Sequence, residues 1–202
     1  VQSFIKNTVN LKSNQWSKIK VKSNTTKTRC WNMVNKAKKY IKIGDIFQVV
    51  LSQRFEAKLT KSPIEIYKKL RISNTSPFMY FFNFSDFQII GASPEILVRL
   101  RDNKITVRPI AGTRPRGKTL AQDKFYEKDL LKDQKELSEH LMLLDLGRND
   151  AGKVSKINTV KVTESFVIEK YSHVMHIVSN VVGKYNKKFS KFKSLLAGFP
   201  AG

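Results

Sequence analysis

The feature of the sequence that most constrains the fold is a series of short apolar runs between residues 77 and 113. The runs at 77–84, 87–92, 96–100 and 105–110 have the length of strands and are too short for most helices. Polar residues at 83–86 and the pair Asp102 and Asn103 are typical of the turns between antiparallel neighbours. This segment therefore predicts an antiparallel meander.

Helical patterns flank the meander. Thr26 or Thr28 is placed to cap a helix that ends at Gly44, and Ser62-Pro63-Ile64-Glu65 has the capping-box spacing that begins a second helix. Further helices are predicted over 121–148 and 189–199, and further strands over 46–59, 160–168 and 173–182. The predicted fold class is α+β, with mostly antiparallel sheets flanked by helices.

The first 25 residues are polar and rich in Ser, Asn and Lys, and they lack a clear periodicity. They are predicted to be a linker or a disordered remnant. Residues 26–202 are predicted to form one folded domain.

The net charge raises the question of nucleic acid. The chain has 38 Lys+Arg against 16 Asp+Glu, a formal charge of +22, and such a charge raises the affinity for any polyanion. The basic residues are spread along the whole chain and form no cluster with interleaved aromatic residues, so we expect no nucleic-acid site. A non-enzymatic, basic nucleic-acid-binding chain remains the alternative class.

Location is predicted from cysteine content and apolar runs. The single cysteine, Cys30, is compatible with a reducing compartment. No apolar run reaches the roughly 18 residues that a membrane span needs. We expect no membrane association and a cytoplasmic location, with a plastid as the alternative.

Two carboxylates suggest a metal site. Glu136 and Glu139 are three residues apart on a predicted helix, so both side chains lie on one face. Magnesium takes one or two such carboxylates together with substrate oxygens. The alternative is solvated ion pairing with Lys132 and Lys135.

A histidine pair and a third carboxylate are also candidates. His173 and His176 lie three apart in a predicted strand, so they point to opposite faces and cannot share one ion. The pattern predicts His176 among apolar neighbours, as a core histidine or as a proton-transfer group. Glu95 follows Ser-Pro, and it is either a turn residue or a general acid.

Six motifs together resemble the chorismate-binding enzyme family, and within it the anthranilate synthase component I branch. Any one of them alone would be weak, but the order and spacing agree from about residue 30 to residue 202. They are GDIFQVVLSQ at 44–53, GASPE at 91–95, RPIAGTRPRG at 108–117, KELSEH at 135–140, DLGRND at 145–150 and YSHVMHIV at 171–178.

The resemblance implies a fold and a set of site residues. The fold is an α/β sandwich whose two large antiparallel sheets, flanked by helices, enclose chorismate and Mg²⁺. Glu95 corresponds to the general acid at the chorismate C4 hydroxyl, and His176 to the histidine linked to the loss of pyruvate. The other positions that it assigns are Gly112 and Thr113 for substrate, Glu139 and its neighbour Glu136 for magnesium, and Pro77, Phe78 and Met79 for feedback tryptophan, where a plain strand entry explains the last three equally well.

Two positions separate the branches of this family. Relatives that add water carry Lys where this chain has Gln48, and an amide cannot act as a base. Many that form 4-amino-4-deoxychorismate carry Lys where this chain has Ala111. The resemblance thus implies a lyase that makes anthranilate and pyruvate from chorismate and ammonia, the first step of tryptophan biosynthesis, with aminodeoxychorismate synthase component I as the alternative.

The resemblance also implies partners and an incomplete site. A glutamine amidotransferase subunit, component II, would supply ammonia, and L-tryptophan would inhibit the full-length protein. Family members continue into Thr-x-Ser-Gly-Ala-Pro-Lys where this sequence stops, at Gly202. The resemblance therefore implies an internal fragment, inactive alone, that lacks the N-terminal part and the C-terminal part of the active site.

Overall fold

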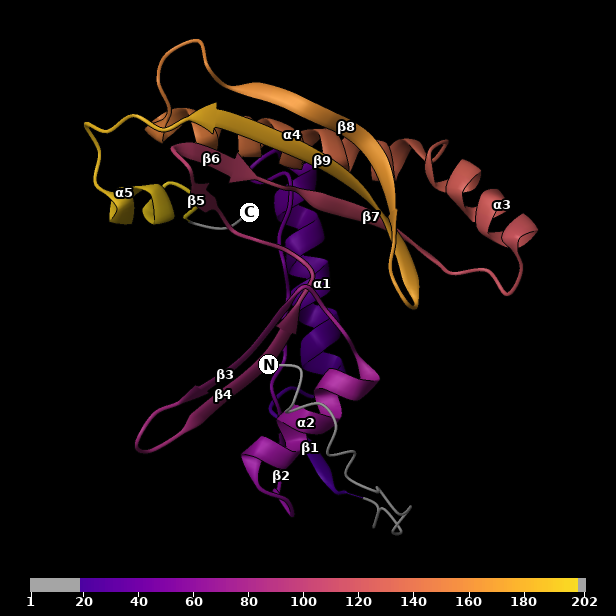
Figure 1. The fold of residues 1–202 in the computed structure, drawn as a ribbon. Helices are drawn as coiled ribbons and strands as arrows, with labels where there is room; N and C mark the ends of the chain where they lie inside the picture. The colour runs from indigo at the N-terminus through magenta and orange to yellow at the C-terminus, as the bar shows by residue number, and fades with distance from the viewer. Residues whose placement is uncertain (1–18, 200–202) are drawn as a thin grey trace. The chain divides into compact units, whose positions relative to one another are not determined.

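The computed structural model describes residues 19–199, which fall into two compact units that divide between Ser62 and Pro63. The first unit contains β1 (Val21–Ser23), α1 (Lys27–Lys42) and β2 (Phe55–Ala57). The second contains the remaining helices and strands (Figure 1). No helix in this described part of the chain is long and apolar enough to cross a bilayer.

In the first unit, a local cap determines where α1 begins. The Thr26 hydroxyl accepts a hydrogen bond from the backbone N–H of Arg29 at 3.2 Å, as the sequence predicts. Gly44, with φ +82°, follows the end of the helix. The predicted cap and the predicted stop signal are both confirmed.

The strand predicted over 46–59 is wrong for most of its length. Only Phe55–Ala57 is a strand, because its partner β1 offers just three residues, with Val21 opposite Ala57. A strand needs a partner to satisfy its backbone groups. The predicted linker over residues 1–25 lies partly outside the described residues, and its described part contains β1.

The second unit begins with a helix and a hairpin. Helix α2 (Pro63–Ser73) starts at the predicted proline and precedes β3 (Phe78–Asn83) and β4 (Gln88–Ser93). The two strands pair antiparallel from Phe78 opposite Ser93 to Asn83 opposite Gln88, which confirms this part of the meander. The Tyr67 ring of α2 lies 5.7 Å from the Phe81 ring of β3, so the helix packs against one face of the hairpin.

A five-stranded antiparallel sheet follows, and β9 (Val174–Lys184) organises it. Strands β6 (Lys104–Val107) and β7 (Ile110–Pro115) pair with successive parts of β9, and β8 (Lys161–Lys170) pairs with β9 as well. The short β5 (Arg99–Arg101) extends the sheet beyond β6. The sequence predicted one strand over 105–110, whereas Arg108 and Pro109 interrupt it, because a proline cannot donate to the ladder.

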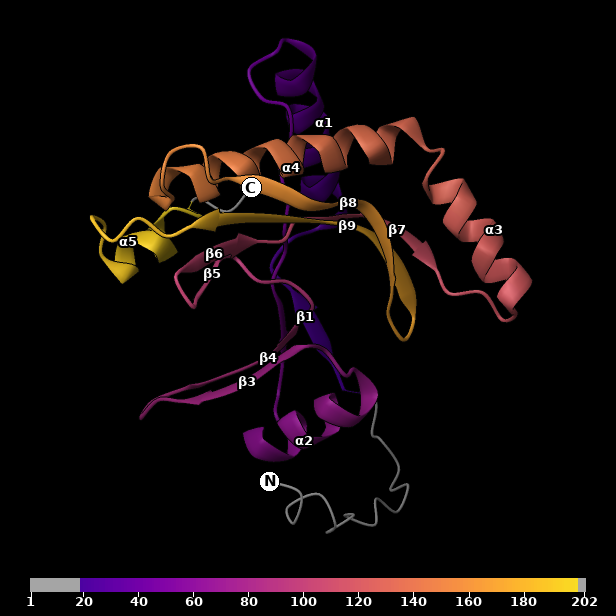
Figure 2. The same ribbon diagram turned by 45° about the horizontal axis from the view of Figure 1, so that its top comes forward.

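Helices cover this sheet. Helix α4 (Gln134–Val154) runs along it and packs on β6, β7 and β9, while α3 (Leu120–Leu130) contacts β7 (Figure 2). One buried cluster joins Ile105, Leu144 and Val181, and a second joins Leu130, Met175 and Ile177. A short helix, α5 (Lys191–Leu196), follows β9 and contacts β5.

The single helix predicted over 121–148 is instead two helices. The Asp133 carboxylate accepts hydrogen bonds from the backbone N–H groups of Lys135 and Glu136, at 3.0 and 3.2 Å, and so caps α4. Arg114 of β7 binds Asp129 at 2.6 Å and Asp133 at 2.8 Å. These ion pairs fix the junction against the sheet, and a helical periodicity does not reveal them.

Candidate active site

The candidate site starts at a bulge between β7 and β9. Thr113 lies opposite His176 in the ladder, and the register shifts between Ala111 and Thr113. Gly112, at the shift, has φ +72°, and a Cβ there would lie 3.0 Å from Ile177 Cδ1. Glycine is therefore required both for the backbone conformation and for the close approach to the core.

The bulge holds one side of the His176 imidazole. Nδ1 lies 2.9 Å from Thr113 Oγ1 and 3.2 Å from the carbonyl oxygen of Gly112. A carbonyl only accepts hydrogen bonds, so this contact favours the tautomer in which Nδ1 carries the hydrogen. Nε2 then carries the lone pair, which is the form that acts as a base.

The hydrogen bonds and the ring contact of His176 join it to polar and aromatic groups, in addition to the apolar neighbours that the sequence predicts. It is half-buried, and its neighbours are Thr113, the Gly112 carbonyl and the Tyr171 ring. The buried histidine is His140, which is 0% exposed. The bulge turns a polar edge of β7 toward His176, and a regular strand pattern does not predict this contact.

Glu95 lies in the connection between β4 and β5 (Arg99–Arg101). The Ser93 hydroxyl accepts a hydrogen bond from the backbone N–H of Glu95 at 3.3 Å and donates one to its carbonyl at 3.1 Å. Desolvation raises the pKa of the Glu95 carboxyl above its usual 4.5, and a hydrogen bond from the Ile110 backbone opposes the shift. Glu95 as a whole is exposed, so the desolvation acts on its carboxyl group from one side only.

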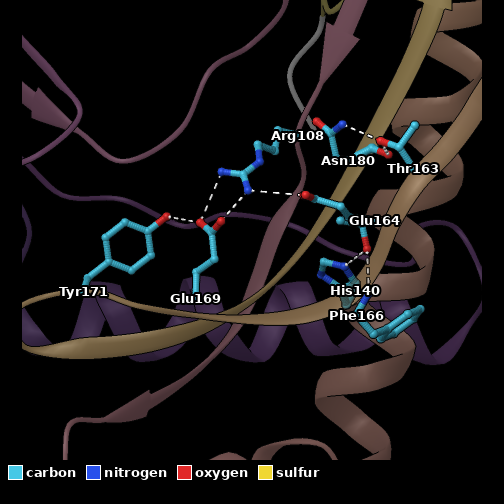
Figure 3. Close-up of polar contacts among 9 residues, drawn as sticks. Arg108, His140, Thr163, Glu164, Phe166, Glu169, Tyr171 and Asn180 are labelled. Carbon is cyan, nitrogen blue, oxygen red and sulfur yellow. Dashed lines mark hydrogen bonds and ion pairs between the residues drawn. The ribbon is translucent and has the colours of Figure 1, made fainter.

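Three residues to which the sequence analysis gave no role form a chain of contacts that begins at the His176 ring: Tyr171, Glu169 and Arg108. Tyr171 places its ring 5.5 Å from the His176 ring, at 62°, and its hydroxyl donates to Glu169 Oε2 at 2.8 Å. Glu169 in turn forms a two-point ion pair with Arg108 (Figure 3). Glu169 lies opposite His176 in the ladder, a signal that was hidden because the predicted strand ended at residue 168.

The two carboxylates proposed for metal lie in the first part of α4. Glu136 and Glu139 are both half-buried, and Lys135 Nζ lies 3.9 Å from Glu136 Oε1. Among residues 19–199 no group of three or more His, Cys, Asp or Glu side chains could hold a metal ion. Two carboxylates on one helix still match magnesium, which takes its other ligands from substrate and water.

The remaining predicted site residues come from other segments of the chain. Gln48 is exposed and belongs to the first unit, in a segment without helix or strand. Pro77 precedes β3, and Phe78 and Met79 begin it, opposite Ser93 and Ala92. Two of the three residues predicted to bind feedback tryptophan, Phe78 and Met79, therefore pair with the strand that leads to Glu95.

Comparison with known proteins identifies the family. The model of the chorismate binding enzyme family matches residues 1–202. The chain belongs to this family. The assignment covers the whole sequence, including the first 25 residues.

Individual members of the chorismate-binding family agree with the assignment. The chain is 60% identical over 182 residues to anthranilate synthase component 1 of Cereibacter sphaeroides, covering 90% of this chain and 36% of that protein. It is 53% identical over 181 residues to the same component of Pseudomonas putida, covering 90% of this chain and 37% of that protein. The chain thus spans little more than a third of these relatives.

Solved structures of the family confirm the α+β fold. Anthranilate synthase component I from Streptococcus pneumoniae superposes with a TM-score of 0.84 at 41% identity, over 92% of this chain and 41% of that one. The menaquinone-specific isochorismate synthase of Escherichia coli has a TM-score of 0.78 at 19% identity, over 98% of this chain and 46% of that one. The second likeness concerns the fold alone.

Proposed function

We propose that the protein containing these residues converts chorismate and ammonia into anthranilate and pyruvate. The observation that carries the proposal is the His176 imidazole, whose Nδ1 is bonded to the β7 bulge so that Nε2 is left as the base. The names of the relatives at 53–60% identity support the same product.

The first half-reaction needs an acid. Ammonia adds at C2 of chorismate while the C4 hydroxyl leaves, and hydroxide is a poor leaving group near neutral pH. Glu95, with its raised pKa, donates a proton so that water departs.

The second half-reaction needs a base. A proton leaves C2, the ring becomes aromatic, and the bond from C3 to the enolpyruvyl oxygen breaks. His176 Nε2 takes the proton, and the released enolate becomes pyruvate when its methylene carbon is protonated. Gly112 and Thr113 bind substrate, because the glycine admits a close approach and the Thr113 hydroxyl offers a hydrogen bond.

Two residues distinguish this reaction from those of related enzymes. Gln48 offers no base for activating water. Ala111 carries no amine for the route that ends at C4, and it is only 8% exposed, so a lysine there would have its stem buried in the sheet. Both features favour anthranilate over isochorismate and over 4-amino-4-deoxychorismate.

Magnesium is the cofactor we propose, held by Glu139 and Glu136 of α4. The ion would neutralise and orient the substrate carboxylate. Glu139→Gln should weaken the Mg²⁺-dependent rise in melting temperature of the full-length protein, and Glu127→Gln, at an ion pair with Lys170, is the matched control. An unchanged rise would remove Glu139 from the metal site.

We also propose a partner, an inhibitor and a location. The designation component 1 of the relatives supports a glutamine amidotransferase component II that delivers ammonia. L-Tryptophan would bind at Pro77, Phe78 and Met79, where β3 pairs with the strand leading to Glu95. Because the relatives named here are bacterial, the bacterial cytoplasm is a better-supported location than a plastid.

The product decides the proposal. Full-length protein is incubated with chorismate, ammonia and Mg²⁺, and the products are separated by chromatography. We expect anthranilate and pyruvate in equal amounts, and His176→Ala should lower pyruvate release about 10²–10⁴-fold. Isochorismate or 4-amino-4-deoxychorismate as the end product, without pyruvate, would overturn the assignment.

A further inference from the structure

We propose that Tyr171 is a positioning residue for His176, and that the ion pair between Arg108 and Glu169 holds Tyr171 in place. The inference rests on the proposed role of His176 as the base in pyruvate release. It adds three side chains to the site, none of which contacts the reacting atoms directly.

Hydrogen bonds alone fix the orientation of the His176 imidazole only in part. The bonds of Nδ1 to Thr113 and Gly112 hold one edge of the ring, but an edge alone leaves the ring able to tilt. Tyr171 lies against the ring at 5.5 Å between centroids, with an interplanar angle of 62°. This edge-to-face contact opposes the tilt and thereby fixes the direction of Nε2.

Hydrogen bonds hold Tyr171 in its position. Its hydroxyl donates to Glu169 Oε2 at 2.8 Å, and its backbone carbonyl accepts from Arg116 Nη1 at 2.7 Å. Its N–H donates to the carbonyl of Val174 at 2.8 Å, which closes the turn between β8 and β9. The residue is thus anchored at both its main chain and its hydroxyl.

The ion pair between Arg108 and Glu169 orients the carboxylate that binds the Tyr171 hydroxyl. Arg108 Nη1 donates to Glu169 Oε2 at 3.2 Å, Nη2 binds Oε1, and Nη2 also lies 3.5 Å from Glu164 Oε2 (Figure 3). Two parallel bonds between a guanidinium and a carboxylate fix the orientation of both groups. Desolvation and the Glu169 carboxylate raise the pKa of Tyr171 to about 12, so its hydroxyl remains a donor at any working pH.

The register connects the network to the site. Glu169 lies opposite His176 on neighbouring strands, and Thr113 lies opposite His176 on the other neighbour. Directly opposite residues project from the same face of a sheet. Glu169, His176 and Thr113 therefore form one row across β8, β9 and β7.

The network is only partly buried. The side chains of Arg108 and Glu169 are 32% and 29% exposed, so solvent screens part of what the ion pair contributes to folding. A small displacement of a reacting group, in contrast, can reduce the rate about 100-fold. Loss of the network should therefore affect catalysis more than stability.

The test uses full-length enzyme with its ammonia source. Tyr171→Phe keeps the ring and removes the bond to Glu169, and Tyr171→Leu removes the ring as well. The matched controls are Tyr185→Phe, which loses a hydroxyl bond to the Phe189 carbonyl, and Glu127→Gln, which loses an ion pair at the end of β8. The kcat for pyruvate release, the KM for chorismate, the rate of amination and the melting temperature are measured for each.

We expect Tyr171→Phe to lower the kcat for pyruvate release about 10-fold, with Tyr171→Leu lower still and the KM within about twofold of wild type. The amination rate and melting temperature should stay near wild type, and the controls should leave kcat unchanged. An unchanged kcat in Tyr171→Leu, or equal losses in both half-reactions, would overturn the inference. Failure of the wild-type enzyme to release pyruvate would instead refute the proposed function itself.

Discussion

Ser179 gives a stability prediction whose size follows from the buried contacts of one hydroxyl. The residue is 0% exposed, and its oxygen accepts from the Phe166 backbone N–H at 3.0 Å and lies 2.7 Å from His140 Nε2. Phe166 has φ +54° where β8 shifts register on β9, so the bond supports a strained position. Ser179→Ala leaves the buried His140 Nε2 and the part-buried Phe166 N–H without this partner, at about 1–3 kcal/mol each.

We therefore expect Ser179→Ala to lower the free energy of unfolding by about 2–6 kcal/mol, measured by urea denaturation. Ser194→Ala is the matched control, because Ser194 is 2% exposed and its Oγ has no hydrogen-bond partner among the described residues. Removing an unsatisfied hydroxyl should be nearly neutral. Equal losses in the two variants would refute the reasoning.

A double-mutant cycle isolates the contribution of His140. Burial lowers the pKa of this imidazole to about 4, so it is neutral at pH 7, and among the described residues its ring is hydrogen-bonded only to Ser179. His140→Leu combined with Ser179→Ala should cost about 0.5–3 kcal/mol less than the sum of the single changes. Strict additivity would show that the two side chains do not depend on each other.

Three further predictions concern Glu95, Asp123 and Gly112. The folded pKa of Glu95 is raised, so its ionisation costs stability as the pH rises above 4.5; Glu95→Gln should lose less stability between pH 4 and pH 7 than wild type, and parallel curves would contradict this. Hydrogen bonds from Arg116 and Gly117 lower the pKa of Asp123 to about 2, so its stabilisation is present above pH 3.8 and lost as the pH falls toward 2. In Asp123→Asn the melting temperature should fall less between pH 3.8 and pH 2 than in wild type. A fall as steep as in wild type would exclude a contribution from the ion pair of Asp123 and Arg116. Gly112→Ala should lower the free energy of unfolding in urea more than Gly44→Ala does. Both positions have a positive φ, which costs an alanine about 1–2 kcal/mol, but only the Cβ at Gly112 would meet Ile177, whereas a Cβ at Gly44 meets nothing within 4 Å. Equal losses in the two variants would exclude an effect of the Ile177 contact.

The parts of the fold that the sequence predicted correctly depend on local interactions. The cap at Thr26 and the helix start at Pro63 each involve residues within one turn, so their spacing is enough. The break at Asp133 was not predicted because it is stabilised by Arg114, a residue of β7. The strand predicted over 46–59 is mostly absent because its partner, β1, has only three residues. The length of that partner cannot be read from the residues of the predicted strand.

The residues of the candidate site were likewise only partly predictable from the sequence. The family resemblance assigned roles to Glu95, Gly112 and His176, and these assignments stay predictions. Tyr171 and Glu169 were not identified, because their relation to His176 depends on a strand register with two shifts. A period-two pattern predicts which residues share a face only while the register is regular.

The central place of β9 has a consequence for how the chain is made. Ile110 of β7 pairs with Val178, and Thr106 of β6 pairs with Val182, so both early strands await a segment that the ribosome adds much later. Until then Ile105 and Val107, which are 0% and 8% exposed in the folded sheet, are without their cover. Pairing across such a separation closes slowly, and unpaired apolar strands aggregate. Nascent chains that stall before residue 174 should therefore depend on chaperones, whereas chains that have passed Lys184 should close the sheet on their own.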